Sequence, residues 1–189
     1  EMPVLLGEIK VLGVTAHWTP SGGAERSLGY TQEGWTINGT PHTIDIKVNE
    51  LGETPVDEVA NGYELTVEGA LAVATQENTA LAMNAAKTTV VGPPQKVSYD
   101  ISPLAGGSLP KGQLRLHPMD KGDADLSEDW TFFKCSVVAG AQIVYRLNGQ
   151  LYIPVRFKVL VDQDPVTGKV RLACNGDATT GVYFTLPGA

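Results

Sequence analysis

Two stretches of two-residue alternation, on either side of an acidic linker, constrain the fold of this chain most strongly. Apolar and polar side chains alternate in HTIDIKVNE (42–50) and again in YELTVEGALAV (63–73). A period of two places successive side chains on opposite faces of a β-strand, so each stretch predicts a strand with one wet face. The linker ELGETPVDEVANG (50–62) joins them, and its carboxylates are Glu50, Glu53, Asp57 and Glu58. Two alternating strands joined by such a linker predict a long hairpin arm over about 42–70. Linkers of about a dozen residues are usually functional or disordered.

Further strand-like runs, separated by turn signals, occupy most of the remaining chain. They lie at 7–18, 27–39, 87–92, 95–101, 112–118, 130–140, 141–149, 150–162, 168–174 and 181–187. Asn38-Gly39 predicts a tight turn, and Asn148-Gly149 predicts a hairpin. Gly34 indicates a bulge or a close backbone approach.

A single helix is predicted, over about 75–86 in TQENTALAMNAA. Thr75 is the expected N-cap, and Leu81 and Met83 belong to an apolar stripe. One helix in an otherwise β chain should pack on a sheet or plug one end of a sandwich. At 189 residues the chain can bury a substantial core, so we expect one mainly β domain over residues 1–189.

The formal charge of −7 argues against a surface that grips nucleic acid, because neutralising phosphates requires clustered Lys and Arg. No run approaches the roughly 20 apolar residues of a spanning helix. The N-terminal EMPVLLGEIKVLG carries charges where the apolar core of a signal peptide has none. We therefore expect a protein with no membrane partner and no visible export signal.

The sequence contains no signature of nucleophilic catalysis. There is no G-x-S-x-G motif, and the three histidines, His17, His42 and His117, are interpreted as polar residues on solvent faces of strands. Cys135 and Cys174 sit in separate apolar runs and are expected to be reduced thiols, able to pair only if their strands are adjacent. No enzyme activity is predicted.

Cofactor motifs are equally absent from the sequence. No His or Cys pair has zinc spacing, and neither Gly-Gly pair has the Lys and helix of a phosphate loop. A solvated acidic loop is the interpretation of DKGDADLSED, and a Ca²⁺ site is its alternative. Its carboxylates are Asp120, Asp123, Asp125, Glu128 and Asp129. No cofactor or metal is predicted.

The acidic linker has two interpretations. Its charges could simply keep an exposed loop soluble. Its apolar residues, however, would be poorly placed if all were exposed, so we expect the loop to reach a neighbouring subunit. The expected contact residues are Glu50, Leu51, Glu53, Pro55, Val56 and Asp57.

Residues 28–85, about a third of the chain, resemble the major tail tube proteins of long-tailed bacteriophages. The resemblance lies in LGYTQEGWTI (28–37), IDIKVNELGETPVDEV (44–59), NGYELTVEGALAVAT (61–75) and ENTALAMNAA (77–86). It implies a β-sandwich or barrel-like tail tube fold with one flanking helix and a long hairpin. Such subunits assemble into hexameric rings with a continuous inner β-barrel, which also covers open sheet edges.

The resemblance further implies a structural virion protein that acts without a covalent step. Stacked rings would form the hollow conduit for DNA ejection, in a tail assembled in the host cytoplasm. The implied partners are other copies of the chain, a tape-measure protein, tail terminator and baseplate or tip proteins, and double-stranded DNA in transit without sequence-specific binding. An acidic lumen makes Asp45, Glu64 and Glu68 candidates for the bore wall, although Lys47, on the same strand face as Asp45, departs from that pattern.

Three other functions remain open at the level of sequence. One is a different tail ring component, such as a terminator or a neck or baseplate adaptor. Another is an immunoglobulin-like or lectin-like binding sandwich. The last is a hydrolase that depends on the histidines.

Overall fold

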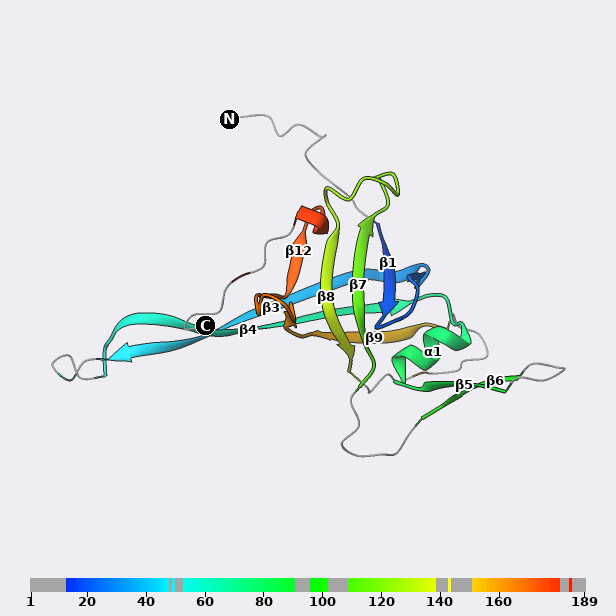
Figure 1. The fold of residues 1–189 in the computed structure, drawn as a ribbon, viewed down its shortest axis with the longest axis horizontal. Helices are drawn as coiled ribbons and strands as arrows, with labels where there is room; N and C mark the ends of the chain where they lie inside the picture. The colour runs from blue at the N-terminus through cyan, green and yellow to red at the C-terminus, as the bar shows by residue number, and fades with distance from the viewer. Residues whose placement is uncertain are drawn as a thin grey trace.

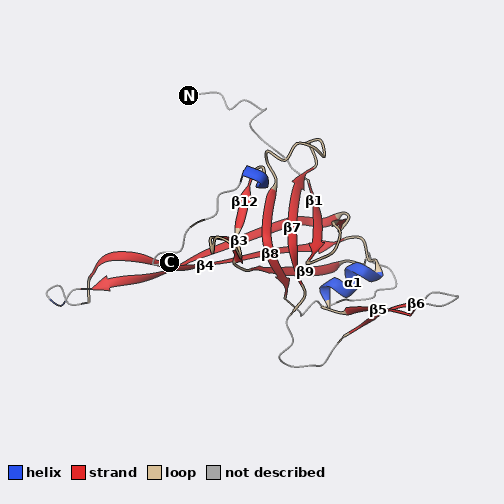
Figure 2. Cartoon of the chain, viewed as in Figure 1, coloured by secondary structure: helices blue, strands red, loops and turns tan. Residues whose placement is uncertain are grey.

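The structure is a computed structural model that describes residues 13–47, 49, 53–90, 96–101, 109–138, 143, 151–180 and 184. The described part is mainly β, with one α-helix (Figures 1 and 2). The strands are β1 (Val14–Pro20), β2 (Arg26–Ser27), β3 (Thr31–Lys47), β4 (Pro55–Leu71), β5 (Ala86–Val90), β6 (Lys96–Asp100), β7 (Lys111–Pro118), β8 (Trp130–Val137), β9 (Ile153–Val159), β10 (Asp162–Gln163), β11 (Val170–Arg171) and β12 (Ala173–Asn175). The helix is α1 (Gln76–Ala82), and a 3₁₀ turn covers Ala178–Thr180.

Eight of these strands form one antiparallel sheet. Seven follow the order β2-β1-β7-β8-β9-β4-β3, and β12 pairs with β8 outside that path. Two small ribbons, β5–β6 and β10–β11, are separate from it. This confirms the expected mainly β architecture with one short helix and a long hairpin.

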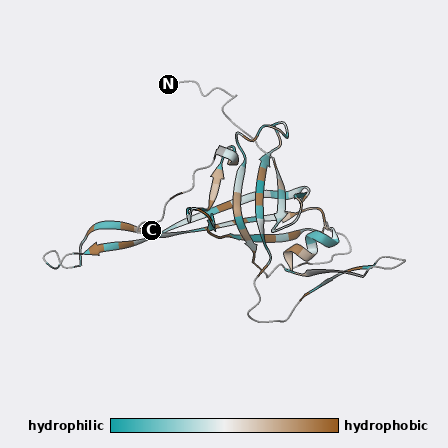
Figure 3. Ribbon diagram, viewed as in Figure 1, coloured by the Kyte–Doolittle hydropathy of each residue, from teal (hydrophilic) through white to brown (hydrophobic). Residues whose placement is uncertain are grey.

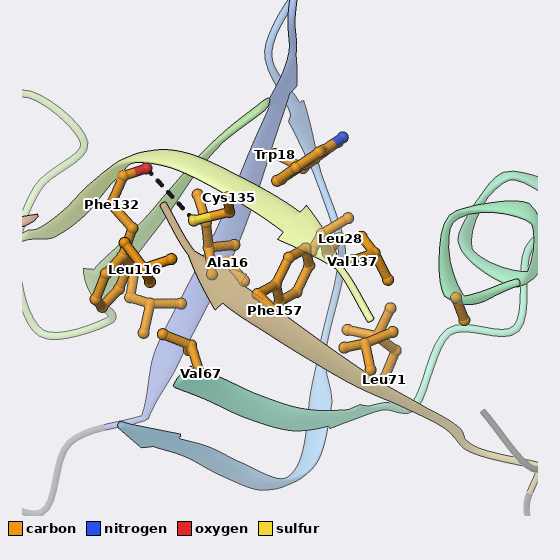
Figure 4. Close-up of a cluster of buried hydrophobic side chains, with 14 of the residues drawn as sticks. Ala16, Trp18, Leu28, Val67, Leu71, Leu116, Phe132, Cys135, Val137 and Phe157 are labelled. Atoms are coloured by element: carbon orange, nitrogen blue, oxygen red, sulfur yellow. Dashed lines mark hydrogen bonds between the residues drawn. The ribbon is translucent and has the colours of Figure 1, made fainter. Parts of the chain in front are cut away.

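The sheet curls so that its two halves enclose the core. Trp18 on β1 and Trp35 on β3 both approach Phe157 on β9, with ring centroids 5.2 Å and 6.1 Å away. Because β7 and β8 separate β1 from β9 in the sheet order, the first contact requires the sheet to fold over itself. The buried cluster between the halves also includes Leu71 and Phe132 (Figure 4).

The long hairpin differs in extent from the prediction. Asn38-Gly39 is not a turn, because β3 continues through it with Asn38 opposite Thr66 and Gly39 opposite Leu65. A side chain at position 39 would collide with the ring of Tyr63, so this glycine serves close packing within the ladder. Most of the predicted linker is also strand, since β4 already begins at Pro55.

Helix α1 begins where predicted and ends earlier. The backbone N–H of Asn78 donates to the Thr75 hydroxyl at 3.1 Å, which confirms the N-cap. The helix stops at Ala82, because Asn84 adopts a left-handed φ of 53° and the chain then enters β5. The helix lies against β9, in agreement with the expectation that it packs on a sheet.

Most other predicted strands are present with shifted ends. Gly34, at φ 78°, lies within a register shift of β3 and confirms the predicted bulge. The predicted strand at 168–174 is divided into β11 and β12. The Asn148-Gly149 hairpin, most of 141–149, the start of the first strand and all but Phe184 of the last one lie outside the described residues.

Candidate interaction surface

The most distinctive surface of the chain is the outer part of the β3–β4 hairpin, which projects from the body as a two-stranded ribbon (Figure 1). We call its described residues, 43–47 and 53–60, the distal arm. It begins at a bulge, where His42 lies opposite Gly62 but Thr43 lies opposite Ala60, so that Asn61 is skipped. Gly62 has a φ of 140°, which glycine adopts readily. A bulge bends and twists its strand, which favours departure of the ribbon from the body.

One face of the distal arm is mainly apolar and the other mainly acidic. Ile44 lies opposite Val59, and Ile46, on the same side of the ribbon, lies opposite Asp57. The intervening pair, Asp45 and Glu58, lies on the other side, which Lys47 shares. Ile44 is 54% exposed and Val59 is 49% exposed. Figure 3 shows apolar and polar segments alternating along the projecting strands. The ribbon therefore leaves apolar surface uncovered on one side and places two carboxylates side by side on the other.

The predicted contact residues are partly visible on this arm. Glu53, Pro55, Val56 and Asp57 are all exposed there. Glu50 and Leu51 lie outside the described residues. The sequence interpretation of 50–62 as a linker was wrong from Pro55 onward, because proline is tolerated as the first residue of a strand and Val56 and Val59 favour extended backbone.

The outer face of the sheet carries paired charges. Arg156 Nε lies 2.9 Å from a Glu68 carboxylate oxygen, and Lys158 Nζ lies 3.2 Å from one of Glu64. The hydrogen bond and charge of Lys158 hold the pKa of Glu64 below its ordinary value. His42 is 3.8 Å from the same carboxylate. The part of this face on β4 and β9 is thus polar and locally balanced in charge.

The three residues expected to line a bore are therefore not equivalent. Glu64 and Glu68 share one face, because they are four residues apart on β4 and each forms an ion pair with a side chain of β9. Asp45 belongs to the distal arm, and by alternation it lies on the opposite side of β3 from His42. The sequence could not show this division, because the bulge and the β4–β9 pairing are tertiary features.

Two of the histidines belong to a polar network that joins β1, β7 and the segment before β8. His117 Nδ1 donates to Asp129 Oδ1 at 2.6 Å, and Arg115 donates to the other oxygen of Asp129 at 3.1 Å. Arg115 also contacts Glu25 at 2.6 Å, and His17 Nδ1 is 3.1 Å from Glu25. Burial, and next the charge of Arg115, lower the pKa of His17.

The expectation that the histidines lie on solvent faces is wrong for His117, which is only 4% exposed. The polar loop after β7 returns to His117 at Asp129. This contact between the loop and β7 is not visible as a sequence pattern. The His117–Asp129 pair has the geometry of a histidine oriented by an acid. Its remaining nitrogen, Nε2, is buried and has no hydrogen-bond partner within the described part of the chain. A substrate could not reach that nitrogen in this conformation.

Ion pairs connect the two ends of the acidic loop after β7. Lys121 Nζ lies 3.4 Å from Glu128 and 3.9 Å from Asp125. Asp129 is directed at His117 and Arg115. No group of three His, Cys, Asp or Glu side chains suited to a metal occurs within the described ranges.

Both cysteines are free thiols, as expected. β12 and β8 are neighbours, but the register places Cys174 opposite Thr131 and not opposite Cys135. Burial raises the pKa of Cys135 to about 12. A thiol with that pKa supplies almost no thiolate near neutral pH, so Cys135 is unsuited to nucleophilic chemistry.

A shallow groove lies where the body meets the hairpin. Its lining combines aromatic and aliphatic side chains, namely Ile37, Tyr63, Leu65, Trp130 and Leu172. Tyr63 is 53% exposed, and Trp130 stacks on Phe132 with ring centroids 6.0 Å apart. The groove offers a partner an aromatic surface with one phenolic hydroxyl.

Among the described helices, none is long and apolar enough to cross a membrane. Comparison of the chain with protein-family models and with curated proteins found no match.

Proposed function

We propose that this chain is the tail tube subunit of a long-tailed bacteriophage. The observation that carries the proposal is the distal arm, whose apolar face is uncovered in the single chain. Soluble monomers seldom place contiguous apolar surface on a projecting ribbon, where it is a liability unless another chain covers it. The resemblance of residues 28–85 to tail tube proteins implies an assembly, stacked hexameric rings, in which such an arm can contact a neighbouring subunit.

The open edge of the main sheet supports the same proposal. β3 is 17 residues long and ends the strand order, so its outer edge is unpaired among the described strands. Long exposed edges invite pairing with another chain. In a ring of six copies, each edge would meet a neighbouring subunit, and together the sheets would close into an inner barrel. Rings stacked through the distal arms would then form a hollow tube.

The proposed conduit works by geometry and electrostatics. The surface of β4 and β9 that carries Glu64 and Glu68 is the best candidate for the bore wall, because it is polar and its cations, Arg156 and Lys158, are already paired. A wall that offers DNA no unpaired cluster of Lys or Arg would let the duplex pass without holding it. The tape-measure protein would occupy the same bore before ejection, and terminator and baseplate or tip proteins would contact its ends.

Electron microscopy of the purified chain tests the proposal directly. Rings or tubes of uniform diameter are the expected result over a series of protein concentrations and ionic strengths. A chain that stays monomeric under all of these conditions would contradict the proposal. Rings that form but never stack would instead favour a terminator or an adaptor, because those components end a tube.

Removal of the distal arm tests its role separately from the fold. Residues 44–59 are replaced by Asn-Gly, which joins the paired positions Thr43 and Ala60 through a two-residue turn. Since the described side chains in this segment are exposed and the core cluster is retained, the variant should fold and melt as the wild type does. It should form no tubes. An unfolded variant would mean that the arm supports the core, and normal tubes would mean that it is not a contact.

One observation favours a second candidate, a lectin-like binding module. The groove with Tyr63 and Trp130 exposes aromatic faces of the kind that can stack on sugar rings. Binding of the monomer to a glycan array, lost in Trp130→Ala and retained in Tyr30→Ala, would favour this function. Tyr30 is a matched control because it is also exposed and lies outside the groove.

A further inference from the structure

Two lysines, on β7 and β8, have no ion pair among the described residues and line one groove. They are Lys111, the first residue of β7, and Lys134 on β8. Their backbones are fixed, because Ser21 N–H donates to the Lys111 carbonyl at 2.8 Å and Leu160 N–H donates to the Lys134 carbonyl at 2.7 Å. The two ammonium groups are therefore presented from rigid strands.

Most other described cations are already engaged. The engaged pairs are Arg26 with Asn78, Lys47 with Glu53, Arg115 with Glu25 and Asp129, Lys121 with Glu128, Arg156 with Glu68, Lys158 with Glu64, and Arg171 with Asp162. Lys96 and Lys169 also have no ion pair within the described residues, but they belong to separate elements, β6 and the turn before β11. Lys111 and Lys134 are the two that line the same groove.

The groove around these lysines is positive and partly apolar. Its lining includes Pro20 and Phe133, and its one described carboxylate, Asp162, accepts a hydrogen bond from Arg171 at 2.9 Å. The Arg171 guanidinium also lies 3.5 Å from the centroid of the Phe133 ring. The charge of Asp162 is thus balanced by Arg171, and the two lysines make the electrostatic potential of the groove positive.

The acidic face of the distal arm carries carboxylates that, like the two lysines, have no ion pair among the described residues. Asp45 and Glu58 lie directly opposite each other, and like charges in that position destabilise a ladder. Neither carboxylate forms an ion pair with a described residue. The arm projects away from β7 and β8 (Figure 1), so it does not reach the groove of its own chain. Lys47, on the same side of β3 as Asp45, is engaged with Glu53, so a cationic partner for Asp45 and Glu58 would come from another molecule.

We infer that the acidic face of the distal arm docks, in a second copy of this chain, on the groove of Lys111 and Lys134. This inference rests on the proposed self-assembly and names the surface that receives the arm. Asp45 and Glu58 would each meet an ammonium group there. Complementary charges of this kind fix the register of an interface and raise its association rate. They also make assembly sensitive to salt, since exposed charges are screened over about 8 Å at physiological ionic strength.

Charge reversal on each side, followed by reversal on both, tests the pairing. The first variant is Lys111→Glu with Lys134→Glu, the second is Asp45→Lys with Glu58→Lys, and the third combines all four changes. The critical concentration for assembly should rise about tenfold or more in each of the first two, and return toward the wild-type value in the third. The matched control, Lys96→Glu with Lys169→Glu, changes the net charge equally outside the groove and should assemble as the wild type does.

Thermal unfolding of each variant separates assembly from folding. If a reversal variant is unfolded, the milder Lys111→Gln with Lys134→Gln replaces it, with a smaller rise in critical concentration expected. Normal assembly of folded lysine variants, or failure of the combined variant to recover, would overturn the pairing while leaving self-assembly intact. A wild-type chain that never assembles would overturn both.

Discussion

Removal of the apolar surface of the distal arm should separate assembly from folding. The change is a triple substitution, Ile44→Thr, Ile46→Thr and Val59→Thr, on the face where Ile44 and Val59 are paired across the ribbon. Threonine keeps the β-branched shape that strands prefer, so the ribbon itself should persist. What is lost is apolar surface that a second chain would cover.

The magnitude follows from the exposed fractions of the side chains. Complete burial of an Ile or Val side chain contributes about 1.5–3 kcal/mol. Ile44, Ile46 and Val59 are 54%, 41% and 49% exposed, so roughly half of that contribution is still available to an interface. About 1 kcal/mol from each gives about 3 kcal/mol per arm, which corresponds to roughly a hundredfold change in an association constant. The free energy of unfolding should change by no more than about 0.5 kcal/mol per site, because exposed substitutions are nearly neutral.

Sedimentation and light scattering measure the critical concentration, and thermal unfolding measures the fold. Val166→Thr is the control, because Val166 is 89% exposed and lies outside the arm. A critical concentration within about twofold of the control would refute the assignment of the apolar face to an interface, since it would correspond to less than about 0.5 kcal/mol. A strongly lowered melting temperature would show that these side chains support the monomer.

Three further predictions concern the body of the protein. Phe157→Ala should lower the free energy of unfolding in urea by about 3–5 kcal/mol, because Phe157 is fully buried between the halves of the sheet; a loss below about 1 kcal/mol would contradict that role. Burial lowers the pKa of His17 in the folded chain, so the unfolded chain binds the proton more readily. Neutral His17 therefore contributes to the free energy of unfolding above pH 6.5, and this contribution should be lost as the pH falls below that value. Denaturation at pH 7.5 and 5.5 should show a smaller pH dependence in His17→Gln than in the wild type, and an equal dependence would count against the shift. A thiol reagent at pH 8 should modify Cys174 and spare Cys135, whose buried thiol has a pKa of about 12, until denaturant is added; equal native reactivity would refute this.

Sequence patterns were reliable where a local rule decides the conformation. The alternation in 42–50 and 63–73 predicted two long strands, since a period of two has one simple structural solution. Thr75 predicted the helix start because its hydroxyl can satisfy a backbone N–H three residues later. Both features depend on neighbours within a few residues.

The same patterns failed where distant contacts decide. Asn38-Gly39 has the composition of a turn, but pairing with β4 keeps it extended. Pro55 and the carboxylates after it have the composition of a linker, but a long partner strand makes them part of a ribbon. His117 has the alternation of an exposed residue, but a loop that returns at Asp129 buries it. Local propensity is weaker in each case than the pairing or burial that the fold imposes.

The sequence by itself determined that this chain forms a mainly β domain with one capped helix and a long acidic hairpin, because hydrophobic period and capping act locally. Only the tertiary structure decided which charges are left without partners. Arg156 and Lys158 are neutralised across the β4–β9 pairing, while Asp45, Glu58, Lys111 and Lys134 form no ion pair within the described residues. Strand register and the curl of the sheet bring residues together over long separations, and no local pattern encodes those distances.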